Sequence, residues 1–290
     1  MADNENKNDV QQKQGHDFTT ANKEFFNTTD YASKYDNDPR FIETVDKYAT
    51  EILKFYPFDK EKTMMMDFAC GTGLASRTWV PHVKSLLGVD ISQGMLNQFD
   101  KRAKELGLTD KIRSVCLELK GEEGELDKLG GEQFDVITCT AAYHHFGDLP
   151  KMTAILVSFL KPGGALIVAD NENAIPGHGH GHGHGHGHGE GHGEDHAYGH
   201  GHGHEHHVPA NEGDSNLEQI DINNPDLYVP KHHLEKVIPQ AEGFTEEGMK
   251  KLFEDAGLVE FEMKKNVVRA KIWKDAEMVV FIAKGVKPKL

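Results

Sequence analysis

The sequence predicts an α/β fold: a doubly wound, Rossmann-like and mostly parallel sheet with helices on both faces. Short apolar runs, typical of buried strands, alternate along the chain with longer stretches of helical period. A glycine turn directly follows the first of these runs. The same alternation resumes after a long low-complexity segment, which indicates one interrupted domain over residues 18–290. Because strands joined through helices make crossover connections, they are expected to be parallel.

The position of each element follows from the same alternation. Strands are expected at 63–68, 86–90, 112–118, 134–139, 165–169, 258–268 and 278–283, and helices at 74–83, 94–106, 149–160 and 245–256. Aromatic and aliphatic residues recur at three- and four-residue steps over 18–58, which predicts two helices there. The break between these helices is expected near Pro39, because a residue that precedes proline avoids helical geometry.

Two segments are too polar to join the core. Residues 1–17 are expected to form a disordered tail, and residues 172–215 a Gly/His-rich loop that interrupts the domain. Alternating Gly and His presents imidazoles on a flexible backbone, and neutral imidazole binds Zn²⁺, Cu²⁺ or Ni²⁺. A divalent transition metal is therefore expected, away from any catalytic centre, on His178, His180, His182, His184, His186 and His188. The alternatives are a repeat expansion without a role and a pH-sensitive solubility segment.

Charge and composition restrict the partners. The 32 basic against 47 acidic residues give a net charge of −15 without a basic block, which argues against nucleic acid. No apolar run reaches the roughly 20 residues of a spanning helix, and the start of the chain does not resemble a leader. The three cysteines lack metal-type spacing, and their odd number argues against a disulfide framework. We expect a cytoplasmic protein, with the nucleus as the alternative, that acts on a small molecule.

The glycine turn after the first strand carries most of the functional information. It reads Asp67-Phe-Ala-Cys-Gly-Thr-Gly73 and places free backbone N–H groups at the carboxyl edge of the sheet. Asp90, at the end of the next strand, can accept hydrogen bonds from both hydroxyls of a ribose. Together they predict an adenosine-containing ligand. The charge of Asp67 beside the turn would repel a pyrophosphate and attract an ammonium and a sulfonium. The alternatives are an ordinary strand-to-helix turn and, for Asp90, a helix cap.

The order of the motifs resembles the class I S-adenosylmethionine-dependent methyltransferases, in particular the small-molecule branch that includes ubiquinone and menaquinone enzymes. The resemblance covers about residues 25–170 and, in outline, 244–284. It rests on the glycine turn and on Gly88-Val-Asp90-Ile-Ser, Phe134-Asp135-Val-Ile, His144-His145-Phe and Leu160-Lys-Pro-Gly-Gly164. It implies a seven-stranded sheet with an antiparallel last strand, S-adenosyl-L-methionine as cofactor, and an N-terminal helical lid containing Tyr31 and Tyr35. The alternative for these two tyrosines is packing between helices.

The resemblance also implies the residues around the cofactor, which are Asp67, Ala69, Gly71, Gly73, Asp90, Met95 and Glu118. Asp67, Gly71 and Gly73 correspond to the shell around the methionine part. Met95 corresponds to an apolar residue on the adenine, although a core position is the alternative. Glu118 corresponds to an acidic residue that meets the adenine amino group. Ala69 replaces the usual first glycine, which is tolerable if its φ stays negative.

The candidate catalytic residues follow the fourth strand. In this fold Tyr143, His144 and His145 lie above the sheet edge, and a histidine there can take a proton from a thiol, a phenol or an activated carbon acid. The alternative is that both histidines only shape the pocket. Lys231, His232 and His233 follow the insertion and are further candidates for substrate contact.

Two other functions stay open at this point. One is a metal-buffering or metal-sensing protein whose methyltransferase-like domain is inactive. The other is a nicotinamide-dependent dehydrogenase, which the charge of Asp67 disfavours.

Overall fold

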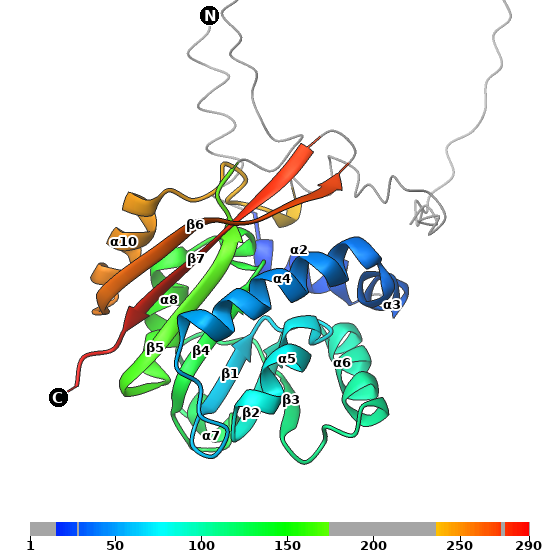
Figure 1. Ribbon diagram of the computed structural model, residues 1–290, viewed down its shortest axis with the longest axis horizontal. Helices are drawn as coiled ribbons and strands as arrows, with labels where there is room; N and C mark the ends of the chain where they lie inside the picture. Colours follow the sequence, from blue (N-terminus) through cyan, green and yellow to red (C-terminus); the bar gives the residue numbers. More distant parts are fainter. Residues whose placement is uncertain (1–15, 28, 174–235, 274–275, 290) are drawn as a thin grey trace, which may run out of the picture.

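The computed structural model describes residues 16–27, 29–173, 236–273 and 276–289. Within them a seven-stranded sheet has the order β3-β2-β1-β4-β5-β7-β6 (Figure 1). The strands are β1 Met64–Phe68, β2 Ser85–Asp90, β3 Ile112–Cys116, β4 Phe134–Thr140, β5 Leu160–Asn171, β6 Val259–Trp273 and β7 Ala276–Val286. Only β7, the last in the chain, runs antiparallel to its neighbours β5 and β6. The predicted Rossmann-like sheet with an antiparallel last strand is confirmed.

The chain changes direction across the sheet at β1 and β4. It runs outward from β1 through β2 to β3, then returns to β4 on the other side of β1. In a doubly wound sheet this switch point opens a crevice at the carboxyl ends of the strands, where ligands bind. The fold therefore fixes the place of the site before any side chain is considered.

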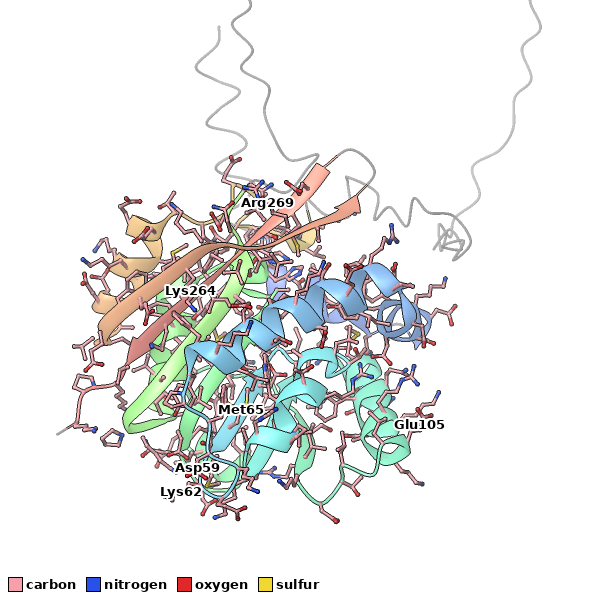
Figure 2. The ribbon with its side chains drawn as sticks, in the orientation of Figure 1. Asp59, Lys62, Met65, Glu105, Lys264 and Arg269 are labelled. Carbon is pink, nitrogen blue, oxygen red and sulfur yellow. The ribbon has the colours of Figure 1, made fainter. Side chains whose placement is uncertain are left out.

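Helices cover both faces of the sheet (Figure 1). One face carries α4 Pro39–Phe55, α5 Leu74–Trp79 and α6 Gln93–Glu105, and the other carries α7 Glu125–Lys128, α8 Leu149–Ser158 and α10 Glu246–Asp255. Because successive strand residues point to opposite faces, Met65 packs in the first layer and Met66 in the second. Figure 2 shows Met65 inside the molecule, whereas Glu105 and Lys62 lie at its periphery.

The N-terminal segment forms three helices where two were expected. α2 Phe18–Phe26 and α3 Thr29–Asn37 precede α4. The predicted break before Pro39 is present, with Asp38 as the N-cap of α4. The additional break follows Asn27, the C-cap residue of α2, whose side-chain oxygen accepts a hydrogen bond from Gly94 N at 2.9 Å. A contact distant in sequence thus ends α2, and helical periodicity contains no sign of it.

Several other boundaries differ from the predictions. The helix expected to start at residue 74 becomes a 3-10 turn at Val80–His82, where Pro81 cannot continue an α-helix. β3 ends at Cys116, short of the predicted residue 118. β5 begins at Leu160, so the Pro-Gly-Gly segment belongs to a strand and does not close α8. The single turn α7 was not predicted.

The structure describes only a small part of the predicted tail and of the predicted insertion. Residues 1–15 and 174–235 lie outside the described residues, and with them the six tract histidines 178–188 and residues 231–233. Asp17, expected in the tail, instead caps α2 and accepts a hydrogen bond from Thr20 N at 3.1 Å. Among the described residues, no helix has the length and apolar character needed to cross a bilayer.

Candidate active site

A cavity of about 290 Å³ lies at the carboxyl edge of the sheet, beside the switch point. Its floor is made by the ends of the strands: Phe68–Gly71 after β1, Asp90 and Ile91 after β2, and Thr140–Ala142 after β4. Its roof and one wall come from α2, α3 and α4. Residues of the predicted glycine turn, the lid tyrosines and the histidine pair therefore line one cavity.

The glycine turn is held in left-handed backbone geometry. Gly71 and Gly73 have φ of +54° and +76°. A Cβ on Gly71 would lie 3.2 Å from Met95 Cε, and one on Gly73 would lie 2.5 Å from the Phe99 ring. Ala69 has a φ of +55°, so the expected negative φ is wrong and this alanine occupies a conformation that favours glycine.

Asp90 is an acidic group at the end of the cavity beside the glycine turn. Its Oδ2 accepts a hydrogen bond from Gly71 N and its Oδ1 from Ser92 N, both at 2.8 Å. Each carboxylate oxygen keeps a further lone pair for a ligand. Burial raises the pKa of Asp90, while these backbone N–H groups act against that rise. Met95 and Glu118 also line the cavity, and Glu118 pairs with Lys120 at 3.4 Å.

Asp67 lies in the layer below the cavity and does not line it. Its carboxyl group accepts hydrogen bonds from the hydroxyls of Ser76 and Thr138, the latter at 3.2 Å. Burial raises the pKa of Asp67 to about 7 despite these bonds, so the carboxyl is partly protonated at neutral pH. The negative charge beside the glycine turn is therefore that of Asp90. The β1–β2 register places Asp90 on the same face of the sheet as Asp67. Gly73, like Asp67, does not line the cavity.

His144, which lines the cavity, forms a buried pair with Asp170 behind it. The His144 Nδ1 lies 2.8 Å from Asp170 Oδ1, and the backbone N–H of His144 donates to Asp170 Oδ2 at 3.2 Å. Burial by itself would raise the pKa of Asp170. The electrostatic interaction with the His144 imidazole and the hydrogen bonds from His144 and Asn171 nevertheless hold that pKa below its usual value. Asp170 is thus a carboxylate that orients the imidazole of His144.

His145 is held by a different partner. Its Nδ1 lies 2.8 Å from the carbonyl oxygen of Val237, and its ring packs edge-on against Phe26. Burial and the neighbouring His144 lower the pKa of His145 to about 3, so its ring is neutral at physiological pH. Nδ1 must then carry the hydrogen that Val237 accepts, which leaves Nε2 as an acceptor.

Tyr143 does not reach the cavity, which corrects its assignment as a catalytic candidate. Its side chain is fully buried in the core layer of α8, and its hydroxyl lies 3.3 Å from Thr153 Oγ1. Tyr143 is the first residue of the short 3-10 turn Tyr143–His145, and its neighbours in that turn point elsewhere. Here His144 and His145 face the cavity and Tyr143 faces the core.

Aromatic side chains of the N-terminal helices cover the cavity. Phe25 and Phe26 of α2 contact Tyr31 of α3 at ring distances of 5.1 and 5.4 Å. Tyr31 stacks on Tyr35, and both line the cavity. Burial raises the pKa of Tyr35 to about 12, so its hydroxyl stays protonated. The predicted lid helices therefore cover the cavity, and their aromatic side chains also pack against one another.

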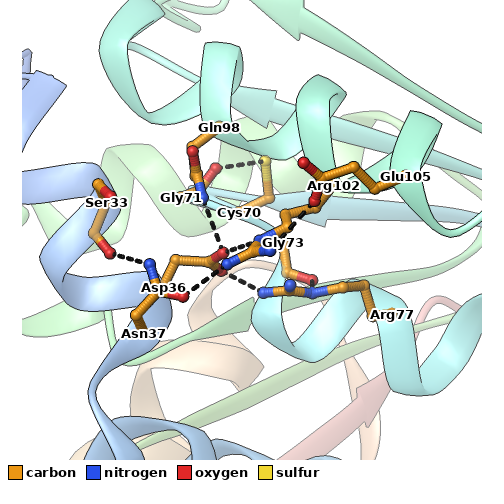
Figure 3. A network of polar contacts seen from close by, with 10 residues as sticks. All are labelled: Ser33, Asp36, Asn37, Cys70, Gly71, Gly73, Arg77, Gln98, Arg102 and Glu105. Carbon is orange, nitrogen blue, oxygen red and sulfur yellow. Dashed lines mark hydrogen bonds and ion pairs between the residues drawn. The ribbon is translucent and has the colours of Figure 1, made fainter.

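An ionic network anchors α3 to the glycine turn (Figure 3). The fully buried carboxylate of Asp36 pairs with Arg77 of α5 and with Arg102 of α6, the latter at 2.5 Å. Gln98 donates to the same carboxylate at 3.0 Å. Arg77 also donates to the carbonyl oxygen of Gly73 at 3.1 Å, so one side chain joins the lid and the turn.

The cavity lining is mostly apolar and contains few charged groups. None of the described lining residues is Lys or Arg, and the ionisable lining groups are Asp90, Glu118, Cys70, two histidines and three tyrosines. The described part of the chain contains no cluster of three or more potential metal ligands. The arrangement suits a neutral acceptor beside a positively charged ligand near Asp90.

Three residues of the site were not identified from the sequence. Asp170 ends β5 at the same sheet edge as Asp90, and this position is a signal that was available. Asn22 and Asp36 lie on amphipathic lid helices. Polar residues on a helix are usually solvated, so only the tertiary contacts reveal their roles.

Known proteins resemble this chain in sequence. Residues 66–166 match the family model described as a methyltransferase domain. An uncharacterized methyltransferase of Schizosaccharomyces pombe is 36% identical over 138 residues, which are 47% of this chain and 48% of that protein. A demethylmenaquinone methyltransferase of Bacteroides fragilis is 34% identical over 113 residues, which are 37% of this chain and 42% of that protein. The chain thus spans about half the length of these relatives or less.

Solved structures share the fold. The magnesium protoporphyrin IX methyltransferase of Synechocystis PCC 6803, crystallised with bound SAH, gives a TM-score of 0.57 at 14% identity, covering 93% of this chain and 100% of that one. A SAM dependent methyltransferase of Aquifex aeolicus gives 0.52 at 14% identity, covering 89% and 98%. The fold and the matched domain together confirm the resemblance drawn from the motifs.

Proposed function

From the premise that residues 66–166 form a methyltransferase domain, we propose that this chain is an S-adenosylmethionine-dependent methyltransferase acting on a small molecule. The acceptor atom is one that carries a proton at neutral pH, such as a hydroxyl oxygen. The single observation that supports this proposal best is that His144, held by the buried carboxylate of Asp170, lines the same cavity as Asp90.

The residues at the cofactor end fit S-adenosylmethionine. Free carboxylate lone pairs on Asp90 suit the two hydroxyls of a ribose. Gly71 leaves open the space that a Cβ would take against Met95, and the Met95 side chain offers an apolar surface for a base. The same end is acidic, which disfavours a diphosphate and favours a cationic ligand. Asp90, Met95 and the turn around Gly71 would therefore hold the cofactor.

Bound S-adenosylmethionine supplies an activated methyl group, so the protein's own task is alignment, exclusion of water and removal of the acceptor's proton. The lid excludes water. Asp170 accepts the Nδ1 hydrogen of His144, and the unprotonated Nε2 of His144 is then the base. His145, whose Nδ1 hydrogen goes to Val237, helps to position the acceptor.

The surroundings of the cysteines support a reducing compartment. Cys70, Cys116 and Cys139 are all free thiols, and burial raises the pKa of each of them. A raised pKa lowers the fraction of reactive thiolate at neutral pH, which is consistent with cysteines that stay reduced. We therefore place the reaction in the cytoplasm or nucleus.

The test compares His144→Gln and Asp170→Asn with the unchanged protein in an assay of S-adenosylhomocysteine release from a panel of phenols, thiols and amines. We expect His144→Gln to lower kcat about 100-fold or more, because general-base catalysis contributes about that much. We expect Asp170→Asn to lower kcat as well, with unchanged affinity for S-adenosylhomocysteine in both variants.

The matched control is His82→Gln, since His82 is exposed and remote from the lining residues. It should leave kcat unchanged. Full activity of His144→Gln on every accepted substrate would contradict the assignment of His144 as base.

A further inference from the structure

The structure points to a specificity-determining residue that the sequence motifs do not contain. Resting on the methyltransferase function proposed above, we propose that Asn22 selects uncharged acceptors that carry a second hydrogen-bond donor beside the group to be methylated. The side-chain oxygen of Asn22 would accept that donor while His144 receives the proton of the reacting hydroxyl.

Asn22 lies on α2, lines the cavity and is 5% exposed. Its Nδ2 donates to the carbonyl oxygens of Phe18 at 2.8 Å and Val237 at 2.9 Å. Because these acceptors require the nitrogen on that side, the orientation of the amide is fixed. Its Oδ1 is buried and has no hydrogen-bond partner among the described residues.

An unpaired buried acceptor is costly. An acceptor left unsatisfied keeps the full cost of losing its water, and native proteins contain few such atoms. A residue that lines a ligand cavity recovers this cost when the ligand supplies the missing donor. The unpaired Oδ1 of Asn22 is thus a specific reason to expect a donor on the acceptor molecule.

The groups around Asn22 share its hydrogen-bonding character. The carbonyl of Val237 accepts from both Asn22 Nδ2 and His145 Nδ1, which places these two side chains together. The rings of His145 and His144 lie 4.1 Å apart. With Nδ1 of each histidine engaged, the groups left over are Nε2 of His144, Nε2 of His145 and Oδ1 of Asn22. All three are acceptors, so this end of the cavity favours a ligand that brings donors.

The rest of the cavity favours a flat and uncharged ligand. Its other walls include Phe25, Phe146 and Tyr31, and no described lining residue is Lys or Arg. An anionic acceptor would find no lysine or arginine among the described lining residues to pair with it, and it would face the charge of Asp90. A neutral aromatic molecule would make the same apolar contacts without the free-energy cost of burying a charge.

The proposed methyl transfer needs only the acceptor, the cofactor and His144. The acceptor oxygen forms a bond to the methyl carbon as the bond from that carbon to the sulfonium sulfur breaks, and sulfur keeps the electron pair. The hydroxyl proton passes to His144 Nε2 and from there to solvent. Asn22 touches the acceptor without exchanging a proton, and it therefore influences binding and alignment.

The experiment measures binding of three matched probes by calorimetry to the full chain loaded with S-adenosylhomocysteine. The probes are 2,3-dihydroxynaphthalene, 2-naphthol and 3-hydroxy-2-naphthoate, which differ in one neutral donor or one negative charge. They are titrated into the unchanged protein, Asn22→Leu, and the control Asn97→Leu, which places the same change on the exposed surface of α6.

We expect the unchanged protein and Asn97→Leu to bind the diol at least tenfold more tightly than 2-naphthol, and the naphthoate more weakly still. Asn22→Leu should reduce the preference for the diol to about twofold or less while keeping its affinity for 2-naphthol. Equal preference in the unchanged protein and Asn22→Leu would overturn the proposal, and so would tightest binding of the naphthoate or no binding of any probe.

A fourth probe and the binding of S-adenosylhomocysteine complete the test. If Asn22→Leu does not fold, 3-methoxy-2-naphthol, which keeps the shape of the diol without its second donor, must bind the unchanged protein at least tenfold more weakly than the diol. Failure to bind S-adenosylhomocysteine would refute the proposed function, whereas cofactor binding without a preference for the diol would refute the role of Asn22 alone.

Discussion

At the scale of single residues, the glycine turn shows how closely the cofactor loop is packed. Replacing Gly73 by Ala adds a Cβ that would lie 2.5 Å from the ring of Phe99, at a φ of +76°. Left-handed backbone costs about 1–2 kcal/mol for a non-glycine residue, and overpacking costs about 1–3 kcal/mol more. We expect Gly73→Ala to lower the free energy of unfolding by about 2–4 kcal/mol, measured by urea denaturation.

Gly107 offers a control with the same backbone and free space. Its φ is +66°, and an added Cβ would meet nothing within 4 Å. Gly107→Ala should therefore cost only the backbone term, about 1 kcal/mol. If the two variants were equally stable, the contact between the turn and Phe99 would not be what requires glycine at position 73.

His145 should influence how stability depends on pH. Its pKa is about 3 in the folded protein, whereas an exposed histidine has a pKa of about 6.5. Between these values the unfolded chain binds a proton at this residue and the folded chain does not, so its contribution to stability falls as pH falls from 6.5 towards 3. Urea denaturation at pH 7.5 and pH 5 should show a smaller loss for His145→Gln than for the unchanged protein. A larger loss in that variant would contradict the assignment of His145 as neutral.

At this scale the sequence predicted one end of the site better than the other. The positions of Gly71, Asp90 and His144 follow from strands that end at a common edge, and all three line the cavity. Asp67 lies beside the turn in sequence, but its side chain turns into the layer below, where Ser76 and Thr138 hold it. Motif spacing gives the position of a residue along the chain and does not give its hydrogen-bond partners.

At the scale of elements, the network around Asp36 connects the lid to the cofactor turn (Figure 3). Asp36→Asn would leave the guanidinium groups of Arg77 and Arg102 partly buried without their carboxylate. Removing one partner of a buried ion pair costs about 3 kcal/mol. We expect this variant to bind S-adenosylhomocysteine at least fivefold more weakly and to unfold at a lower urea concentration.

The same network predicts a pH limit. Burial would raise the pKa of Asp36, but hydrogen bonds from Gln98, Arg102 and Arg77 hold it below its usual value. The carboxylate therefore stabilises the fold above the unfolded pKa of about 3.9, and this contribution disappears as pH falls through the lower folded value. The unchanged protein and Asp36→Asn should approach each other in stability below about pH 3. A difference that grew on acidification would contradict the network.

The elements themselves were largely predictable, because strand alternation and helical period are local signals. The breaks at Pro39, which was predicted, and at Asn27, which was not, illustrate the two outcomes. A proline can be recognised in the sequence as the start of a helix. The end of α2, in contrast, coincides with a hydrogen bond from Gly94, which is distant along the chain. Boundaries set by tertiary contacts are the part that periodicity does not contain.

At the scale of the whole molecule, the histidine tract and the methyltransferase domain should act independently. Metal binding by His178 and the alternate histidines up to His188 stays a prediction, since the tract lies outside the described residues. Deleting residues 178–207 should abolish calorimetric uptake of Ni²⁺ and Zn²⁺ while leaving the affinity for S-adenosylhomocysteine unchanged. Loss of cofactor binding in the deletion would show that the two parts are coupled.

The fold class was predictable at this scale because one sheet explains every apolar run on both sides of the insertion. The function depends on a feature that no single run contains. Segments far apart in sequence, among them α2, the turn at Gly71 and the end of β5, enclose one space. That space has an acidic end at Asp90 and an end at His144 and Asn22 where the free groups accept hydrogen bonds.

The most direct test of the account is calorimetric titration of S-adenosylmethionine into the unchanged protein and into Asp90→Asn at pH 7.5. We expect one site with a dissociation constant on the order of 10 μM in the unchanged protein, weakened at least tenfold in the variant. No binding in a folded, unchanged protein, or equal affinity in both, would contradict the central claim that the cavity beside Asp90 holds this cofactor.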